Sequence, residues 1–307
     1  MSTIIFHKSW WLDSVAQDRW GMAKILQEDE VVAQLPYMRT KRWGQKGLIQ
    51  PPLTPYMGPW LRTTPGKHST KLAREKELMT QLVSQLPPCD YFNQRFHYSI
   101  TNWLPFYWQG FNQTTLYTYV IDNISNPDEL WERLAPNIRR EIKKARNRYH
   151  LMVRCDLGLD ILYQIVELTY QRQGQSVPFS KSLLSRIDQS CREHNSSRSF
   201  FAVDKNDGVH AVAYIVWDKQ SAYYLIGGGD PRFRTSGAAS LLIWEAILFS
   251  ASVCDRFDFE GSMIPGVERF FRAFGATQYP YFKLTRMRTR VQIMKSMADI
   301  YKSIGKH

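Results

Sequence analysis

One stretch of this sequence, residues 221–240, constrains the fold more than any other, and it reads SAYYLIGGGDPRFRTSGAAS. Its apolar and aromatic start is typical of a buried strand, and three consecutive glycines follow. A polar loop then leads into residues 237–253, a long apolar segment in which Glu245 is the charged residue. The pattern predicts a strand, a β-bulge at Gly227 to Gly229, a turn, and a buried helix.

The turn before this helix has the composition of a phosphate-binding loop. Residues 234–239 follow the pattern R-x-x-G-x-A. Small residues at Gly237 and Ala239 would let a phosphorylated ligand approach the main chain, where first-turn N–H groups and the helix dipole favour negative charge. Arg234 would add a cationic contact. A surface loop whose glycine only begins a helix is the alternative, since so short a pattern recurs by chance.

This turn resembles the pyrophosphate-binding turn of the GNAT acyltransferase superfamily, which reads Q or R, x, x, G, x, G or A. The resemblance implies acyl-CoA as the donor and no metal ion. The four cysteines agree, because they lie far apart without a C-x-x-C pair. The residues that the resemblance places at the donor are Ile226, Gly227, Arg234, Thr235, Ser236, Gly237, Ala238, Ala239 and Ser240.

The order of elements in the second half supports the resemblance. Periodicity predicts a strand, two helices, three strands at hairpin spacing, the helix from Gly237, a strand at RFDFEGS, a short helix and a final strand pair. This is the element order of a GNAT domain. In that fold the strand ending at the glycines splays from RFDFEGS to admit the acyl donor.

The length of 307 residues leads us to expect two domains. The first half loosely repeats the helix and paired-strand pattern. With NIRREIKKA and FDFEGSMIPGVERFFRAFGA, the chain resembles the two-lobed, FemAB-like Fem peptidyltransferases, which carry aminoacyl groups from tRNA to peptidoglycan precursors. We therefore expect an α/β (α+β) protein with two GNAT-like lobes, each a mixed, mostly antiparallel sheet flanked by helices. The expected parts are a degenerate lobe at 1–125, a basic connector helix at 126–150, an acyltransferase lobe at 151–290 and a basic tail at 291–307.

The resemblance also implies where the chemistry lies. In the GNAT fold a main-chain N–H of the fourth strand holds the acyl carbonyl, and the base comes from the facing fifth strand. Alternation along RFDFEGS puts Asp258 and Glu260 on one side, so Glu260 is the candidate general base and Asp258 a candidate substrate contact. A carboxylate that caps the next helix or pairs with an arginine is the alternative for Glu260.

The usual general acid of this fold is missing. Family members commonly carry a tyrosine four residues before the glycine that ends the following helix, and this chain has Phe271 there, counted from Gly275. Phenylalanine cannot donate a proton. Water, Tyr223, Tyr224 or Tyr281 would have to replace it, and we take Tyr224 as the second catalytic candidate. Otherwise the donor is not a thioester, or the protein binds without transferring.

Three further residues are candidate acceptor contacts. The resemblance places Gln173 and Gln175 over the acceptor site, although a helix C-cap at Gly174 explains them equally well. Tyr56 lies in the rigid loop TPYMGPW, where a substrate wall or simple packing is expected.

The net charge is +12 and it is unevenly distributed. Residues 139–148 hold six basic residues and one acidic residue, and residues 283–306 hold seven and one. Such clusters suit a phosphate-rich partner: a nucleotide, a tRNA or an anionic membrane surface. A solvated helix face and a loose basic tail are the alternative.

Three functions fit these observations: transfer from acyl-CoA to a small-molecule or peptide amine, tRNA-dependent aminoacyl transfer of the Fem type, and non-catalytic binding. Fem enzymes often carry a long helical hairpin, and no segment here is long enough for one. The start of the chain is too polar for a secretory signal, and no uncharged apolar span is long enough to cross a bilayer. We therefore expect a cytoplasmic protein.

Overall fold

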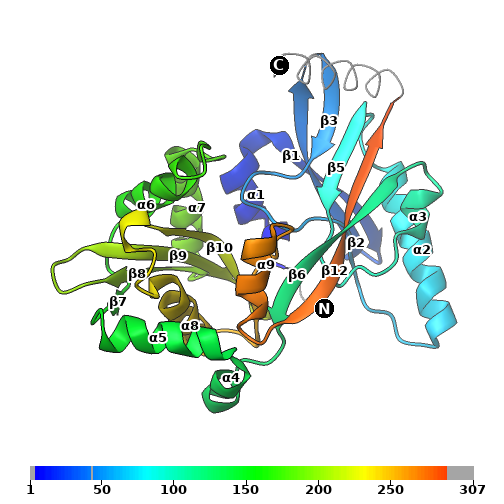
Figure 1. Ribbon diagram of the computed structural model, residues 1–307. Helices are drawn as coiled ribbons and strands as arrows, with labels where there is room; N and C mark the ends of the chain where they lie inside the picture. The colour runs from blue at the N-terminus through cyan, green and yellow to red at the C-terminus, as the bar shows by residue number, and fades with distance from the viewer. Residues whose placement is uncertain (1–3, 43, 289–307) are drawn as a thin grey trace, which may run out of the picture. The chain divides into compact units, whose positions relative to one another are not determined.

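The computed structural model describes residues 4–42 and 44–288 (Figure 1). The chain divides into two compact units. Of the described residues, the first unit contains those from Phe6 to Leu116 and from Pro280 to Arg288, and the second contains Ile4, Ile5 and Tyr117–Tyr279. The division falls inside strands β6 (Asn112–Ile121) and β12 (Thr277–Met287), so each strand contributes to both units. The predicted tail at 291–307 lies outside the described residues.

The first unit is a mostly antiparallel sheet with helices. Its strands follow the order β1-β2-β3-β5-β12, with β4 paired to β2, and only the β3–β5 pair among these described pairs is parallel. Helix α2 buries Leu78, Met79, Leu82 and Val83 in the core of the unit. The elements are η1 (Ile5–His7), α1 (Ser9–Ala16), η2 (Gln17–Arg19), β1 (Trp20–Gln27), β2 (Glu30–Arg42), β3 (Gln45–Ile49), β4 (Trp60–Leu61), α2 (His68–Ser84), β5 (Tyr91–Arg95) and α3 (Leu104–Tyr107).

The second unit is a sheet in the order β6-β11-β10-β9-β8-β7, in which β10 and β11 are parallel and the other described pairs are antiparallel. Helices α6 and α7 cover one face and α8 covers the other, with α5 outside it (Figure 1). The elements are α4 (Pro127–Arg133), α5 (Pro136–Asn147), β7 (Met152–Arg154), α6 (Leu159–Gln171), α7 (Lys181–Glu193), β8 (Ser197–Val203), β9 (Val209–Trp217), β10 (Ser221–Gly229), η3 (Pro231–Phe233), α8 (Ala238–Ser250), β11 (Arg256–Asp258) and α9 (Pro265–Arg272).

The predicted fold class is confirmed: two lobes, each a mixed, mostly antiparallel sheet flanked by helices. From β7 to β12 the elements follow the predicted order, except that the final strand pair is the single long strand β12. Helix α8 is apolar over most of its circumference because the sheet and α5 cover most of it, with Ala239 exposed and Glu245 half-buried.

The predicted connector helix differs from the structure in two ways. It is split into α4 and α5, because Leu134 is extended and Pro136 starts a new helix, where its missing N–H costs nothing. Both helices lie within the second unit, and α5 buries Ile138, Ile142 and Ala145 against the core that contains α8. The basic residues of this segment therefore lie on the outer face of an integral helix.

Candidate functional site

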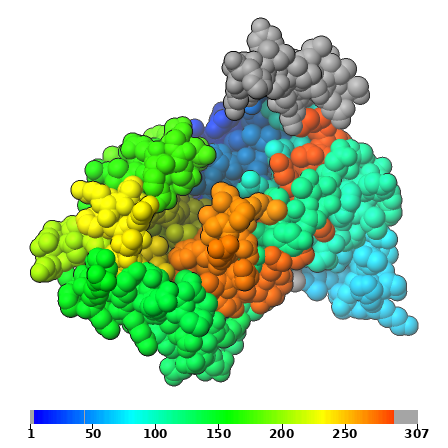
Figure 2. Space-filling model, viewed as in Figure 1, coloured from blue at the N-terminus to red at the C-terminus, as the bar shows by residue number. Residues whose placement is uncertain are grey.

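The neighbouring strands β10 and β11 separate after a short pairing. Their register joins Ser221 to Arg256, Ala222 to Phe257 and Tyr223 to Asp258, where β11 ends. From Tyr224 onward β10 runs on beside β9 alone. The surface of this unit is hollowed between the segment after β10 and α9 (Figure 2). This is the splayed strand pair that the resemblance implies.

The β-bulge lies at Leu225 and not at the glycines, so its predicted position is wrong. Tyr224 pairs with Ile215 and Ile226 pairs with Tyr214, which leaves Leu225 as the extra residue, whereas Gly227 to Gly229 pair regularly with β9. The bulge changes the side of the sheet to which the following side chains point.

The glycines instead make room for neighbours. A Cβ on Gly228 would lie 3.1 Å from the Val166 Cα of α6, so the helix packs directly on the strand. Thr169 of the same helix binds both polar groups of Gly229: its hydroxyl accepts from the N–H at 2.8 Å and donates to the C=O at 3.1 Å. These contacts fix the end of β10.

Tyr224 occupies the opening. Its hydroxyl lies over Gly227, so close that a Cβ on that glycine would be 1.6 Å from the hydroxyl oxygen. Its ring packs edge-on against Phe271 of α9, with centroids 5.9 Å apart. Burial raises the pKa of Tyr224 to about 12, which keeps the hydroxyl protonated at neutral pH.

The other tyrosines considered as replacements for the missing acid are engaged elsewhere. Tyr223 is buried and its hydroxyl donates to Asp218 at 3.3 Å. Tyr281 belongs to the first unit, where its ring packs against Tyr56 at 5.5 Å. Tyr224 is therefore the one of the three that meets Phe271.

Glu260 follows β11 in a strained but well-held conformation. Its φ is +59°, and its N–H donates to Asp258 Oδ1 at 2.7 Å. Thr118 donates to the same oxygen at 2.7 Å, so the fully buried Asp258 carboxylate holds the turn. Gly261 must lack a side chain, because a Cβ would lie 2.1 Å from the Tyr117 carbonyl. The strand ends at Asp258, so the predicted alternation does not reach Glu260, whose side chain is half-buried.

The turn before α8 is open at some positions and filled at others. Arg234, Thr235 and Ala239 are exposed, whereas Ser236 and Gly237 are buried. The N–H of Ala238 donates to Ser236 Oγ at 3.4 Å, and the N–H of Ser236 donates to Phe233 O. Within the described residues, the N–H groups of Gly237 and Ala239 donate to no protein acceptor, although Gly237 itself is buried against α5. Ile226, also predicted at the donor, is buried in β10 just before Gly227.

Gly237 is required for helix packing as well. Its φ is +78°, and a Cβ would lie 2.3 Å from the Glu141 carbonyl oxygen of α5. The Glu141 carboxylate, which pairs with Lys144, would lie 3.3 Å from the same Cβ. A negative charge therefore already stands beside the positive end of α8.

The predicted acceptor contacts lie in two places. Gln173 and Gln175 are exposed after α6, whose end is a Schellman motif: Gln175 N–H donates to Tyr170 O, Gly174 N–H donates to Gln171 O, and Gly174 has φ +66°. The C-cap explanation of these residues holds. Tyr56 is fully buried in the first unit, where rings of its own unit surround it, so in this structure it is a core side chain.

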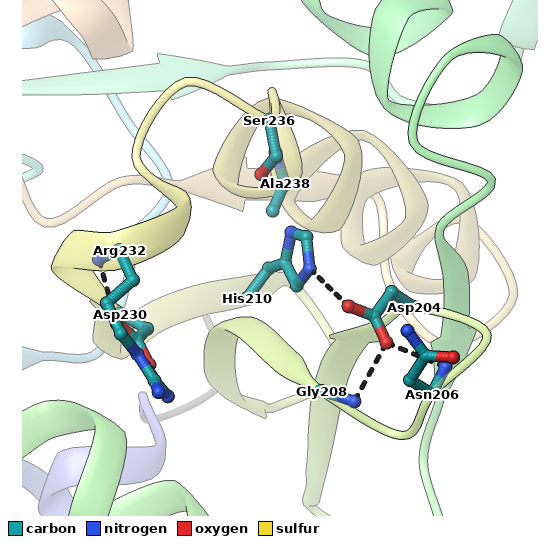
Figure 3. A network of polar contacts seen from close by, with 8 residues as sticks. All are labelled: Asp204, Asn206, Gly208, His210, Asp230, Arg232, Ser236 and Ala238. Atoms are coloured by element: carbon teal, nitrogen blue, oxygen red, sulfur yellow. Dashed lines mark hydrogen bonds and ion pairs between the residues drawn. The ribbon is translucent and has the colours of Figure 1, made fainter.

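Sequence reasoning missed a polar network below this turn (Figure 3). Asp204 Oδ1 accepts the N–H groups of Asn206 and Gly208, and Oδ2 lies 3.0 Å from His210 Nε2. These contacts, that of His210 first, lower the pKa of Asp204. Residues 204–210, in the β8–β9 hairpin, follow the pattern D-x-x-x-G-x-H. The role of this network depends on η3, because the ring of Phe233 stacks on the ring of His210, with centroids 3.9 Å apart and planes 4° from parallel.

Within residues 4–42 and 44–288, no three histidine, cysteine or acidic side chains come together as a metal site. None of the helices in these ranges combines the length and apolar character that a bilayer-spanning helix needs.

Comparison with known proteins agrees with the geometry. The family model described as the acetyltransferase (GNAT) domain matches residues 133–272. A search of curated protein sequences gives no match. Among solved structures, FemX is 11% identical with a TM-score of 0.65, and the alignment covers 91% of each chain.

Two other structures have the same fold. A conserved protein of unknown function from Bacteroides thetaiotaomicron is 11% identical with a TM-score of 0.55, covering 91% of this chain and 90% of that chain. L-PGS from Bacillus licheniformis is 10% identical with a TM-score of 0.51, covering 94% and 90%. At these identities the likeness concerns the fold.

Proposed function

We propose that this chain, whose residues 133–272 match the acetyltransferase (GNAT) domain and whose two-lobed fold is like that of FemX, is an N-acyltransferase that moves an acyl group from acyl-CoA to an amine. The observation that carries the proposal is the position of Tyr224. Its protonated hydroxyl lies over Gly227, beyond the last β10–β11 pair, and its ring packs against Phe271, which occupies the place of the family's usual acid. A binding protein would not need a proton donor there.

The proposed reaction uses main-chain N–H groups to stabilise the oxyanion, Glu260 as the general base and Tyr224 as the general acid. Main-chain N–H groups near Ile226 and Gly227 hold the thioester oxygen, where charge develops in the transition state. Glu260 takes a proton from the acceptor amine, whose nitrogen then bonds to the acyl carbon. The carbon–sulfur bond breaks, and Tyr224 gives its proton to the departing thiolate. Proton exchange with solvent restores both side chains. Asp258 positions Glu260 through the 2.7 Å bond to its N–H.

A second candidate is aminoacyl transfer from tRNA, and the outer face of α5 favours it. Arg140, Lys143 and Arg148 are exposed there. The described part of the other basic segment offers less, because Arg286 stacks on Phe111 at 4.4 Å and Arg288 pairs with Asp90 at 3.4 Å. Binding of tRNA would be steeply salt-dependent.

Donor binding and turnover separate these functions. A donor that binds only the folded protein stabilises it by RT ln(1 + [L]/Kd), so thermal shifts with acetyl-CoA and with charged tRNA report the donor directly. We expect a shift with acetyl-CoA and amine-dependent release of free thiol.

The controls distinguish the alternatives. A shift with tRNA alone, abolished when Arg140, Lys143 and Arg148 are changed to glutamate, would replace the acyl-CoA proposal with the tRNA one. A thermal shift with acetyl-CoA, without release of thiol with any amine of a broad panel, would indicate that the protein binds the donor and does not transfer its acyl group.

A further inference from the structure

The buried side chain of His210 has one nitrogen without a partner. The side chain is 3% exposed, and Nε2 lies 3.0 Å from Asp204 Oδ2. Among the described residues, Nδ1 makes no hydrogen bond and is shielded from solvent. A buried polar atom left unpaired costs about 1–3 kcal/mol, so its retention calls for an explanation.

The free nitrogen faces the start of α8. In Figure 3 the ring stands below Ser236 and Ala238, with Asp204 on one nitrogen and the other nitrogen on the side of these two residues. Phe233 stacks on the ring at 3.9 Å, and the ring of Tyr149 lies edge-on at 6.3 Å. A ring flip that turned Nδ1 away from α8 would lose the 3.0 Å contact of Nε2 with Asp204.

From this arrangement we infer that His210 is a contact for a phosphate-bearing ligand at the first turn of α8, and that ligand binding brings a proton to Nδ1. The inference rests on the proposed function for the identity of the ligand, which would be the pyrophosphate of acyl-CoA. His210 would be a binding residue for the donor, distant from the acyl chemistry.

The charges around the ring give the direction of the proton movement. Without a ligand, the positive end of α8 and the exposed Arg232 oppose a charged imidazole, whereas Asp204 and Asp230 favour it. Asp230 is already neutralised by a 2.7 Å ion pair with Arg232. On the α5 side the titratable residues are Tyr149 and, beside the start of α8, Glu141 with its partner Lys144. The first turn of α8 itself contains no acidic side chain.

An arriving phosphate reverses the balance. Its negative charge offsets the helix dipole, and its oxygen can accept a hydrogen bond only if Nδ1 carries a proton, because Asp204 already takes the hydrogen on Nε2. Binding is therefore coupled to proton uptake at Nδ1.

Two substitutions separate the two ring nitrogens. The amide of His210→Gln can reach Asp204 as Nε2 does but places nothing at Nδ1, whereas His210→Asn supplies a neutral donor near Nδ1. His194→Gln is the matched control, since His194 lies exposed after α7. Thermal unfolding without ligand checks that each variant is folded.

The test is calorimetric titration with acetyl-CoA, and separately with inorganic pyrophosphate, in buffers of different ionisation enthalpy. We expect wild type to take up protons beyond those taken up by His210→Gln, since titration of the ligand itself cancels in this difference. His210→Gln should bind about 10- to 100-fold more weakly, the size of a charge-assisted hydrogen bond. His210→Asn should bind more tightly than His210→Gln while losing the extra proton uptake.

The outcomes bear separately on the two proposals. Equal affinity and equal proton uptake in wild type and His210→Gln would overturn the role of His210 and leave the donor site intact. Binding of pyrophosphate that depends on His210, without binding of acetyl-CoA, would support the role of His210 and contradict the acyl-CoA donor. Failure of wild type to bind either probe would overturn both.

Discussion

Replacing Gly227 with alanine should displace the end of the Tyr224 side chain and leave the backbone in place. Gly227 has an ordinary strand conformation, so alanine is not strained there. The new methyl would lie 1.6 Å from the hydroxyl oxygen, whereas ordinary contacts begin at 3.4 Å, so the oxygen must move by about 2 Å. The ring must move with the hydroxyl, because its Cζ would lie 2.4 Å from the methyl, and the side chain can rotate without a shift of the backbone.

The size of the effect follows from the proposed role of the hydroxyl. A positioned general acid contributes about 10²- to 10⁴-fold. We therefore expect Gly227→Ala and Tyr224→Phe each to lower kcat at least about 100-fold. The free energy of unfolding should change by less than about 1 kcal/mol in Gly227→Ala, because alanine in a strand offsets part of the lost packing.

The assay is thiol release from acetyl-CoA, with KM for acetyl-CoA measured in parallel, in wild type, both single variants and the double variant. Since both substitutions remove the same group, the double variant should be no slower than Tyr224→Phe alone. If the losses in kcat of the two single variants multiply in the double variant, or if Gly227→Ala keeps full activity, the assignment of Tyr224 as the proton donor is refuted.

Phe271, Gly237, Glu141 and His7 each allow a further test. Phe271→Tyr should restore at least about tenfold of the kcat lost in Tyr224→Phe, because it returns a hydroxyl to the family's usual place beside the opening; no gain in the paired variants would count against a shared position. Gly237→Ala should lower the free energy of unfolding by about 2–5 kcal/mol in urea titrations, since φ is +78° and the methyl meets the α5 backbone; an unchanged midpoint would contradict this packing. Glu141→Gln should bind acetyl-CoA several-fold more tightly by calorimetry at low salt, because it removes a negative charge beside the phosphate turn, and weaker binding would show that the carboxylate assists. Burial lowers the pKa of His7 from 6.5 to about 4. The unfolded chain therefore takes up a proton between about pH 7 and pH 5 that the folded protein does not, so the free energy of unfolding should fall by about 2 kcal/mol over this range. His7→Leu should remove this loss, and equal losses in both proteins would refute the prediction.

Local pattern was sufficient to predict the order of elements in the second unit. The apolar run, the glycines and the polar turn at residues 221–240 mark β10 and α8 because each change in pattern reflects a change in burial. Glu260 is predicted from its place on the fifth strand, and Tyr224 as a replacement for the acid missing at Phe271. The structure puts Glu260 just after the end of β11 and Tyr224 just after the β10–β11 pairing, while their catalytic roles remain predictions.

Features that depend on distant partners were not predictable. The bulge at Leu225 is defined by register with β9, and the reason for Gly227 is the Tyr224 hydroxyl above it. The small residue at Gly237 was explained by a ligand alone, whereas a helix a hundred residues earlier in the chain also requires it. The network of His210 depends on the fold of η3 over the β8–β9 hairpin.

A crystal structure of the protein with acetyl-CoA tests the central claim most directly. The account predicts the thioester in the opening beyond Tyr223, with its sulfur beside the Tyr224 hydroxyl, and pyrophosphate oxygens at about 3 Å from the N–H groups of Gly237 and Ala239. A donor bound elsewhere, or those amides still unliganded with acetyl-CoA present, would contradict it.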